Sequence, residues 1–176
     1  MKIKAKNAVV GILIASCLAL VACTQSQLQQ AEALTQVILQ DIPAVLEILA
    51  GAGVLAQPQL TQAQAAAGQA SADFSLVQKL ISDYQATPSV TTADKIRAAL
   101  GDAETNLQAI LTAARVTNPK SQATITGAVT LIINTASQIA AIFPAAPTLA
   151  AVRASNTVKL PTVKAFQAKF HAAIGQ

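Results

Sequence analysis

The sequence predicts an all-α fold: an antiparallel up-down four-helix bundle with an additional short C-terminal helix, after an N-terminal signal helix. Apolar residues recur at steps of three and four along four segments of roughly twenty-five residues each. Proline or glycine marks each break, which favours short connections between antiparallel neighbours. No stretch alternates between apolar and polar residues with a period of two, so no strand is expected.

The first segment contains a proline and ends in glycines. Because Pro43 lacks an N–H and clashes with the preceding turn, the helix is expected to restart or kink there. Gly51 and Gly53 are typical of a helix C-terminus. The apolar stripe of this segment consists of Leu28, Ala31, Thr35, Ile38, Ile42, Val45, Leu49 and Ala52.

The second segment opens at Pro58 and ends at residues 87–89 (Thr-Pro-Ser). Thr91 and Asp94 form a candidate capping box for the third segment. The stripe residues are Leu60, Ala63, Ala67, Ala70, Phe74, Val77, Ile81 and Tyr84 in the second segment, and Ile96, Leu100, Ala103, Leu107, Ile110 and Ala114 in the third.

The fourth segment is predicted to begin with Asn118 as N-cap and Pro119 in the first helical position. Pro144 and Pro147 end it, and Pro161 starts the last helix. The stripes are Ile125, Val129, Ile132, Ala136, Ile139 and Phe143 in the fourth segment, and Val163, Phe166, Phe170 and Ile174 in the last helix.

The first 22 residues have the order of a secretory signal. Lys2, Lys4 and Lys6 form a positive stretch, and residues 8–22 carry no charge. This run of about fifteen residues is shorter than the ~20 that a membrane-spanning helix needs. An uncleaved N-terminal anchor helix is the alternative.

The end of this run, Leu20-Val21-Ala22-Cys23, resembles the lipobox of bacterial lipoproteins. The resemblance implies that the Cys23 thiol receives a diacylglyceryl group, that cleavage follows Ala22, and that the new amine is acylated with a fatty acid such as palmitate. Residues 14–17 (Ile-Ala-Ser-Cys) also fit loosely. Cleavage there would leave the apolar residues 18–22 at the mature N-terminus, so Cys23 is preferred.

The resemblance and the apolar stripes together give an expected domain plan: 1–22 lipoprotein signal peptide, 23–30 lipidated tether, 31–143 helical bundle, 144–160 connector, and 161–175 C-terminal helix packing on the bundle. Two or more acyl chains hold a protein stably on a membrane. Thr24 occupies the position where an aspartate retains many lipoproteins in the inner membrane. By resemblance, the expected location is therefore the bacterial envelope at the outer membrane, facing the periplasm.

The charge is unevenly distributed along the chain. The formal net charge of +4 includes three signal lysines, so the mature chain has nine basic and eight acidic residues. This near balance of charge does not favour a nucleic-acid partner, which a strongly basic chain would suggest. No acid follows Glu104. Either the two halves neutralise each other, or a basic face contacts anionic lipid or an envelope polymer. The candidate contacts are Arg153, Lys159, Lys164 and Lys169.

Candidate catalytic and metal-binding residues are sparse. His171 is the only histidine, which excludes a multi-histidine metal site, and it is expected to be a partly exposed residue near the dipole of a helix C-terminus. Asp102 and Glu104, the closest carboxylates, are two apart and do not share a helix face. No G-x-S-x-G motif or phosphate-binding glycine loop occurs. Neither an enzyme nor a cofactor is expected.

The sequence therefore predicts a non-catalytic, lipid-anchored helical envelope protein that acts as a structural or interaction module. Its expected partners are membrane lipid through acylated Cys23 and an envelope protein or anionic polymer. The alternative is a membrane-active or small apolar-ligand-binding bundle. It rests on residues 121–152, which carry no charge. Their one-sided stripe and frequent polar residues favour a buried central helix over a membrane segment.

Overall fold

The computed structural model describes residues 24–51, 57–115, 118–143 and 157–175. Within these ranges every regular element is a helix, so the predicted all-α class is confirmed for the part of the chain that is described. The signal segment 1–22, Cys23 and Arg153 lie outside the described residues. The helices are α2 (Gln25–Gly51), α3 (Gln57–Ala86), α4 (Val90–Ala114), α5 (Pro119–Ile142) and α7 (Val163–Ile174).

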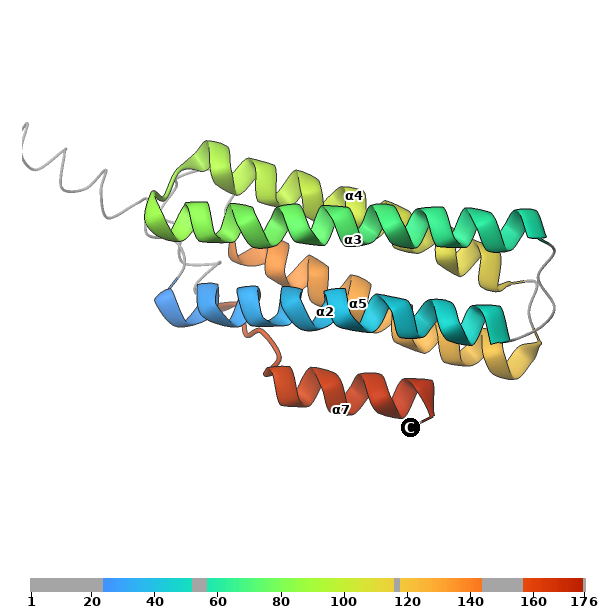
Figure 1. Ribbon diagram of the computed structural model, residues 1–176. Coiled ribbons are helices and arrows are strands. Elements are labelled where there is room, and N and C mark those ends of the chain that lie inside the picture. Colours follow the sequence, from blue (N-terminus) through green and yellow to red (C-terminus); the bar gives the residue numbers. More distant parts are fainter. Residues whose placement is uncertain (1–23, 52–56, 116–117, 144–156, 176) are drawn as a thin grey trace, which may run out of the picture.

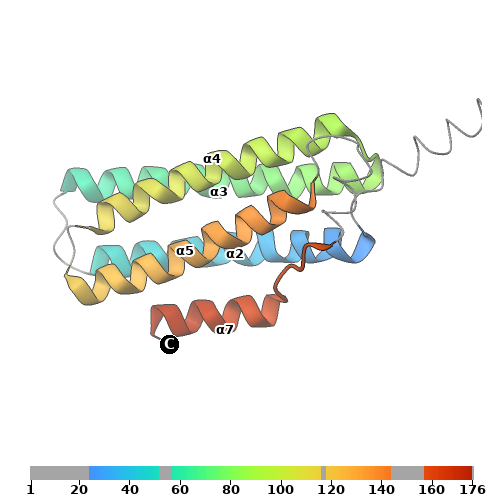
Figure 2. The ribbon, with the colours of Figure 1, turned by 180° about the vertical axis from the view of Figure 1, so that it is seen from behind.

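Four long helices lie side by side and the short α7 lies outside them. Figure 1 shows the chain reversing direction from α2 to α3, from α3 to α4 and from α4 to α5. α3 contacts both α2 and α4, and α5 contacts both α4 and α2, which closes the group of four. Figure 2, seen from behind, shows α7 beside α5 and α2, and the contacts agree. α7 therefore covers the junction between the first and the last helix of the bundle.

The predicted apolar stripes form the core. Every stripe residue of α4 and α5 is buried, as are those of α2 except Ala52, which lies outside the described residues. Leu60 on α3 and Val163 and Ile174 on α7 are half-buried. Many of these positions are alanine, and small side chains let neighbouring helices approach closely. Tyr84 meets Phe143 edge to face with ring centroids 5.4 Å apart, and Phe166 stacks on Phe170 with centroids 6.1 Å apart.

The two buried threonines in the described part of the chain satisfy their hydrogen bonds locally. Oγ1 of Thr35 donates to the carbonyl of Ala31 at 2.8 Å, and Oγ1 of Thr135 donates to that of Leu131 at 2.8 Å. Because each bond stays within one helix, neither threonine needs a polar partner across the core. The core can therefore stay apolar between the helices.

The helix starts agree only partly with the predicted ones. Asn118 caps α5, its side-chain oxygen accepting from the backbone N–H of Ser121 at 2.9 Å, as predicted. Ser89 caps α4 in place of the predicted Thr91–Asp94 box, because its hydroxyl accepts from the N–H of Thr92 at 3.1 Å. The cap forms two residues before the predicted one, where the chain still has the extended conformation that a cap requires.

Pro43 does not end α2, which runs unbroken from Gln25 to Gly51, with the proline exposed on its surface. α2 also begins at Gln25, so residues 25–30, expected in the tether, are helical. The last helix begins at Val163, with Thr162 as its N-cap in place of Pro161. Residue 175 is a glycine with φ +77°, the left-handed conformation that ends a helix at low cost.

Candidate functional site

The predicted anionic-surface contacts that the structure describes lie on α7 and on the segment that leads into it. Lys159 precedes the helix, Lys164 lies in its first turn, and Lys169 lies in its second half. All three are exposed. Arg153 and the lipidation site Cys23 are outside the described residues, so their predicted roles stay predictions.

Two glutamines of α2 hold the segment before α7. Nε2 of Gln27 donates to the carbonyl of Val158 at 3.1 Å. Nε2 of Gln30 donates to the carbonyls of Leu160 at 3.0 Å and Pro161 at 2.7 Å. These bonds join residues about 130 positions apart in the chain. They fix the backbone on both sides of Lys159 against the first turns of α2.

A groove between α5 and the α7 segment brings two of the lysines together. It has a volume of about 340 Å³. We name it the lysine groove, and its lining residues are Leu131, Asn134, Thr135, Gln138, Lys159, Leu160, Pro161, Phe166 and Lys169.

Lys164 does not line this groove. It stands two positions before the buried Phe166, and two residues span about 200° of an α-helix, so it faces away from the bundle. The predicted basic face is therefore divided: Lys159 and Lys169 share the groove, and Lys164 lies on the outer surface of α7.

Among the described residues, none of the three lysines has an acidic ion-pair partner. None of the three makes an ion pair with a described residue, and no carboxylate lines the lysine groove. The ion pair between Asp94 and Arg97 lies within α4, so it does not link the acidic part of the chain to the basic residues after Glu104. Glu104 accepts a hydrogen bond of 2.6 Å from Ser137, a hydroxyl and not a cation. No described acidic residue of the chain up to Glu104 therefore forms an ion pair with any of these three lysines.

His171, expected to be partly exposed near the helix C-terminus, is exposed in the last turn of α7. Across the interface lies Asp41 of α2. Burial raises the pKa of the Asp41 carboxyl above its usual value, and the electrostatic attraction of His171 opposes that rise. Oδ2 of Asp41 is buried and has no hydrogen-bond partner among the described residues. Burial of this carboxyl group therefore disfavours its ionised form in the folded protein.

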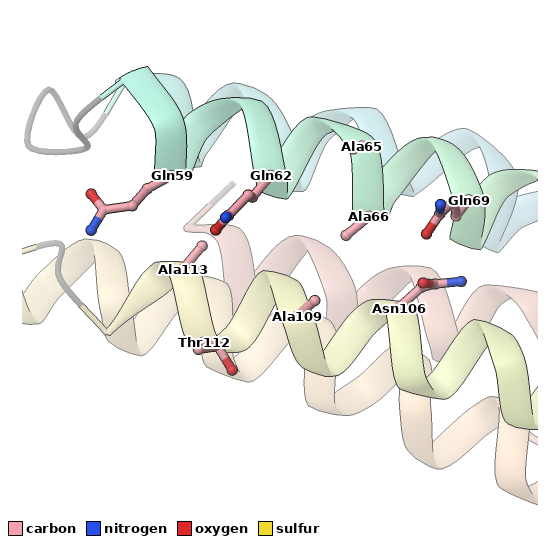
Figure 3. A pocket seen from close by; sticks show the side chains of 9 residues that line it. All are labelled: Gln59, Gln62, Ala65, Ala66, Gln69, Asn106, Ala109, Thr112 and Ala113. Carbon is pink, nitrogen blue, oxygen red and sulfur yellow. The ribbon is translucent and has the colours of Figure 1, made fainter.

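A second groove, of about 640 Å³, runs between α3 and α4 near the start of α3. Figure 3 shows its glutamines extending from α3 toward α4, with alanines between them. The apolar stripes alone do not predict this groove. The available signal was a polar stripe at helical spacing beside alanines. Its lining residues are Gln59, Gln62, Ala65, Ala66, Gln69, Asn106, Ala109, Thr112 and Ala113.

The described part of the chain has no cluster of side chains suited to catalysis or to metal binding. There, no three His, Cys, Asp or Glu residues come together in a way that would hold a metal ion. Asp102, of the closest carboxylate pair in the sequence, is exposed and Glu104 is half-buried. The site with the clearest chemical character is the lysine groove, which is positively charged at its edge.

Two of the described helices are long and apolar enough to cross a membrane. α2 and α5 both have a mean hydropathy of 1.5 over their most apolar stretch, of which 39% and 44% of the residues are buried. Buried core helices of soluble proteins share this property, and the one-sided stripes agree with such a role.

No protein-family model, no curated protein and no solved structure matches the chain.

Proposed function

We propose that the chain is a lipid-anchored, non-catalytic protein of the bacterial envelope, whose antiparallel helical bundle presents an interaction surface close to the membrane. The observation that carries the proposal is the lipobox Leu20-Val21-Ala22-Cys23 behind a basic and then uncharged stretch. By this proposal Cys23 is acylated, and the protein reaches the outer membrane, facing the periplasm, because position 24 is Thr24 and not the aspartate that retains lipoproteins in the inner membrane.

The start of the bundle supports a short tether. α2 begins at Gln25, two residues after Cys23. Gln27 is three residues beyond Thr24, about 4.5 Å of helical rise, and it is bonded to the segment that carries Lys159. An acylated Cys23 would therefore hold this end of the bundle, with its basic residues, at the membrane surface, where anionic lipid attracts them.

Replacement of the two cysteines tests the anchor. Cys23→Ala removes the thiol that accepts the lipid, and we expect the protein to leave the membrane fraction. Cys17→Ala is the matched control, since the same change six residues earlier should leave membrane retention intact. Retention of the Cys23→Ala protein, or its loss in the Cys17→Ala protein alone, would contradict the proposal.

A second candidate function, a membrane-active bundle, draws on the apolar character of α2 and α5. These neighbouring helices are both long enough to span a bilayer, and the junction between them is covered by α7. If α7 undocks, their apolar faces become available to lipid. Liposome partitioning of the chain expressed from Thr24 onward separates the two functions, because this chain lacks both the lipid and the apolar signal stretch and only the membrane-active bundle should insert.

A further inference from the structure

We infer that the lysine groove binds the phosphate-bearing head group of an anionic glycerophospholipid from the membrane in which the protein is anchored. The inference rests on the proposed function, because the acylated Cys23 is what brings the groove to the membrane. It goes beyond a general basic surface, since it assigns the binding to one groove and to two of the lysines.

The groove presents donors from two sides. Lys159 and Lys169 are ten positions apart in the chain, and the packing of α7 on α5 places both on one groove. Asn134 and Gln138, one turn apart on α5, add side-chain amides to the same lining. Ammonium and amide N–H groups donate hydrogen bonds to phosphate oxygens, and the hydrogen bonds from the charged ammonium groups are the stronger ones.

Part of the groove lining is apolar. Phe166 is fully buried and Leu160 is 9% exposed, and Leu131 lies beside them at the edge of the core. A glycerophospholipid has the same division, with the charged phosphate oxygens of its head group at one end and the glycerol and first acyl carbons at the other. A free anion would use the donors of the groove and leave the exposed part of Leu131 uncovered.

The size and place of the groove favour a membrane lipid over an envelope polymer. About 340 Å³ is at the small end of the range for ligand sites, which is roughly 300–1,000 Å³, and suits a single head group. Lys159 is fixed against the first turns of α2 by Gln27 and Gln30. It therefore lies at the end of the bundle that leads to Cys23, where head groups are at their highest concentration.

The electrostatic field of the groove is not cancelled locally. No carboxylate lines it. On α2, the acidic residue that faces α7 is Asp41, which lies against His171 in the last turn, beyond Lys169. On α5 and α7 no acidic residue occurs at all. An anion entering the groove therefore meets two lysines and no repelling carboxylate.

The experiment compares two double variants of the lipidated protein, purified in a neutral detergent. Lys159→Gln with Lys169→Gln removes both charges of the groove. Lys120→Gln with Lys164→Gln is the matched control, since both lysines are exposed, neither lines the groove, and the net charge changes equally. Native mass spectrometry measures the binding of short-chain phosphatidylglycerol, of phosphatidylcholine and of inorganic phosphate to each protein.

We expect the wild type to prefer phosphatidylglycerol to both other probes. Each basic residue near a lipid surface contributes about fivefold, so the groove variant should lose about thirtyfold in affinity, while the control should change by less than about threefold. Equal losses in both variants would overturn the inference in favour of a diffuse surface charge. Inorganic phosphate binding as tightly as phosphatidylglycerol would overturn it in favour of a free anion.

The same spectra separate this inference from the proposed function. The intact mass of each sample reports whether Cys23 is acylated. An acylated protein whose groove variant binds phosphatidylglycerol like the wild type contradicts only the groove assignment. A protein with an unmodified Cys23 contradicts the proposed function itself.

Discussion

The packing of the bundle is tested most sharply at Leu107, in the middle of α4. This side chain is 1% exposed and belongs to the apolar core. Truncation of such a leucine to alanine costs about 2–5 kcal/mol, from lost burial and from the cavity that remains. Leu107→Asp adds an unpaired carboxyl group at the same place, which costs about 1–3 kcal/mol more. The sum, about 3–8 kcal/mol, is comparable with the whole stability of a typical domain.

The matched control is Gln108→Asp, one residue further along the same helix. Gln108 is exposed, so the same new charge stays in water and the change in stability should be within about 0.5 kcal/mol. Urea unfolding followed by helical circular dichroism measures both variants. A loss at Leu107 no larger than that at Gln108 would refute the assignment of this stripe to the core.

The sign of the pH dependence at Leu107→Asp can also be worked out. A buried carboxyl has a raised pKa, so the folded state keeps its proton to a higher pH than the unfolded state does. The stability of the variant should therefore fall as the pH rises from about 4 toward neutrality. A variant that is least stable at acid pH would contradict a buried position for this residue.

Three further predictions concern the docking of α7. Burial holds the pKa of the Asp41 carboxyl above its unfolded value, so the contribution of this group to the free energy of unfolding falls as the pH rises above about 4. Asp41→Asn should remove that fall. Urea unfolding at a series of pH values measures it. Gly127→Ala places a Cβ 3.6 Å from that of Ala173, an ordinary contact, so it should stabilise by roughly 0.5–1 kcal/mol through helix propensity, and a thermal melt checks it. Phe170→Ala empties a fully buried position, and should weaken α7 docking by about 3–5 kcal/mol, seen as faster amide hydrogen exchange in α7 than in α4.

The helices and the core could be predicted because a stripe of apolar residues at three-four spacing determines which face is buried. Leu107, Ile132 and Phe166 were assigned to the core by spacing alone, and each is buried. The exact helix ends were harder to predict. Ser89 caps α4 because of its extended backbone and a bond to Thr92, which depend on how the preceding connection is folded.

Pro43 shows a similar limit of sequence reasoning. Proline costs a helix about 3 kcal/mol, which predicted a restart or a kink, and α2 continues through Pro43 without restarting. Ile42 and Val45 on either side are buried, and their packing in the core compensates for the loss of one backbone bond. Tertiary packing, which a local pattern does not show, decided the outcome.

The lysine groove could be predicted only in part. The run of basic residues after Glu104 is visible in the sequence, and Lys159 and Lys169 were among the candidates. Their convergence depends on the docking of α7 against α5 and on the bonds from Gln27 and Gln30, which span about 130 residues. The separation of Lys164 from the other two follows from helical geometry once Phe166 is known to be buried.

The central claim, a lipid anchor at Cys23, is tested most directly by the intact mass of the protein taken from the membrane fraction. The account predicts a chain that starts at Cys23, lacks the 22 residues before it, and carries the added mass of two or three acyl chains on that residue. A chain that starts at Cys17, or one that contains an unmodified Cys23, would contradict it.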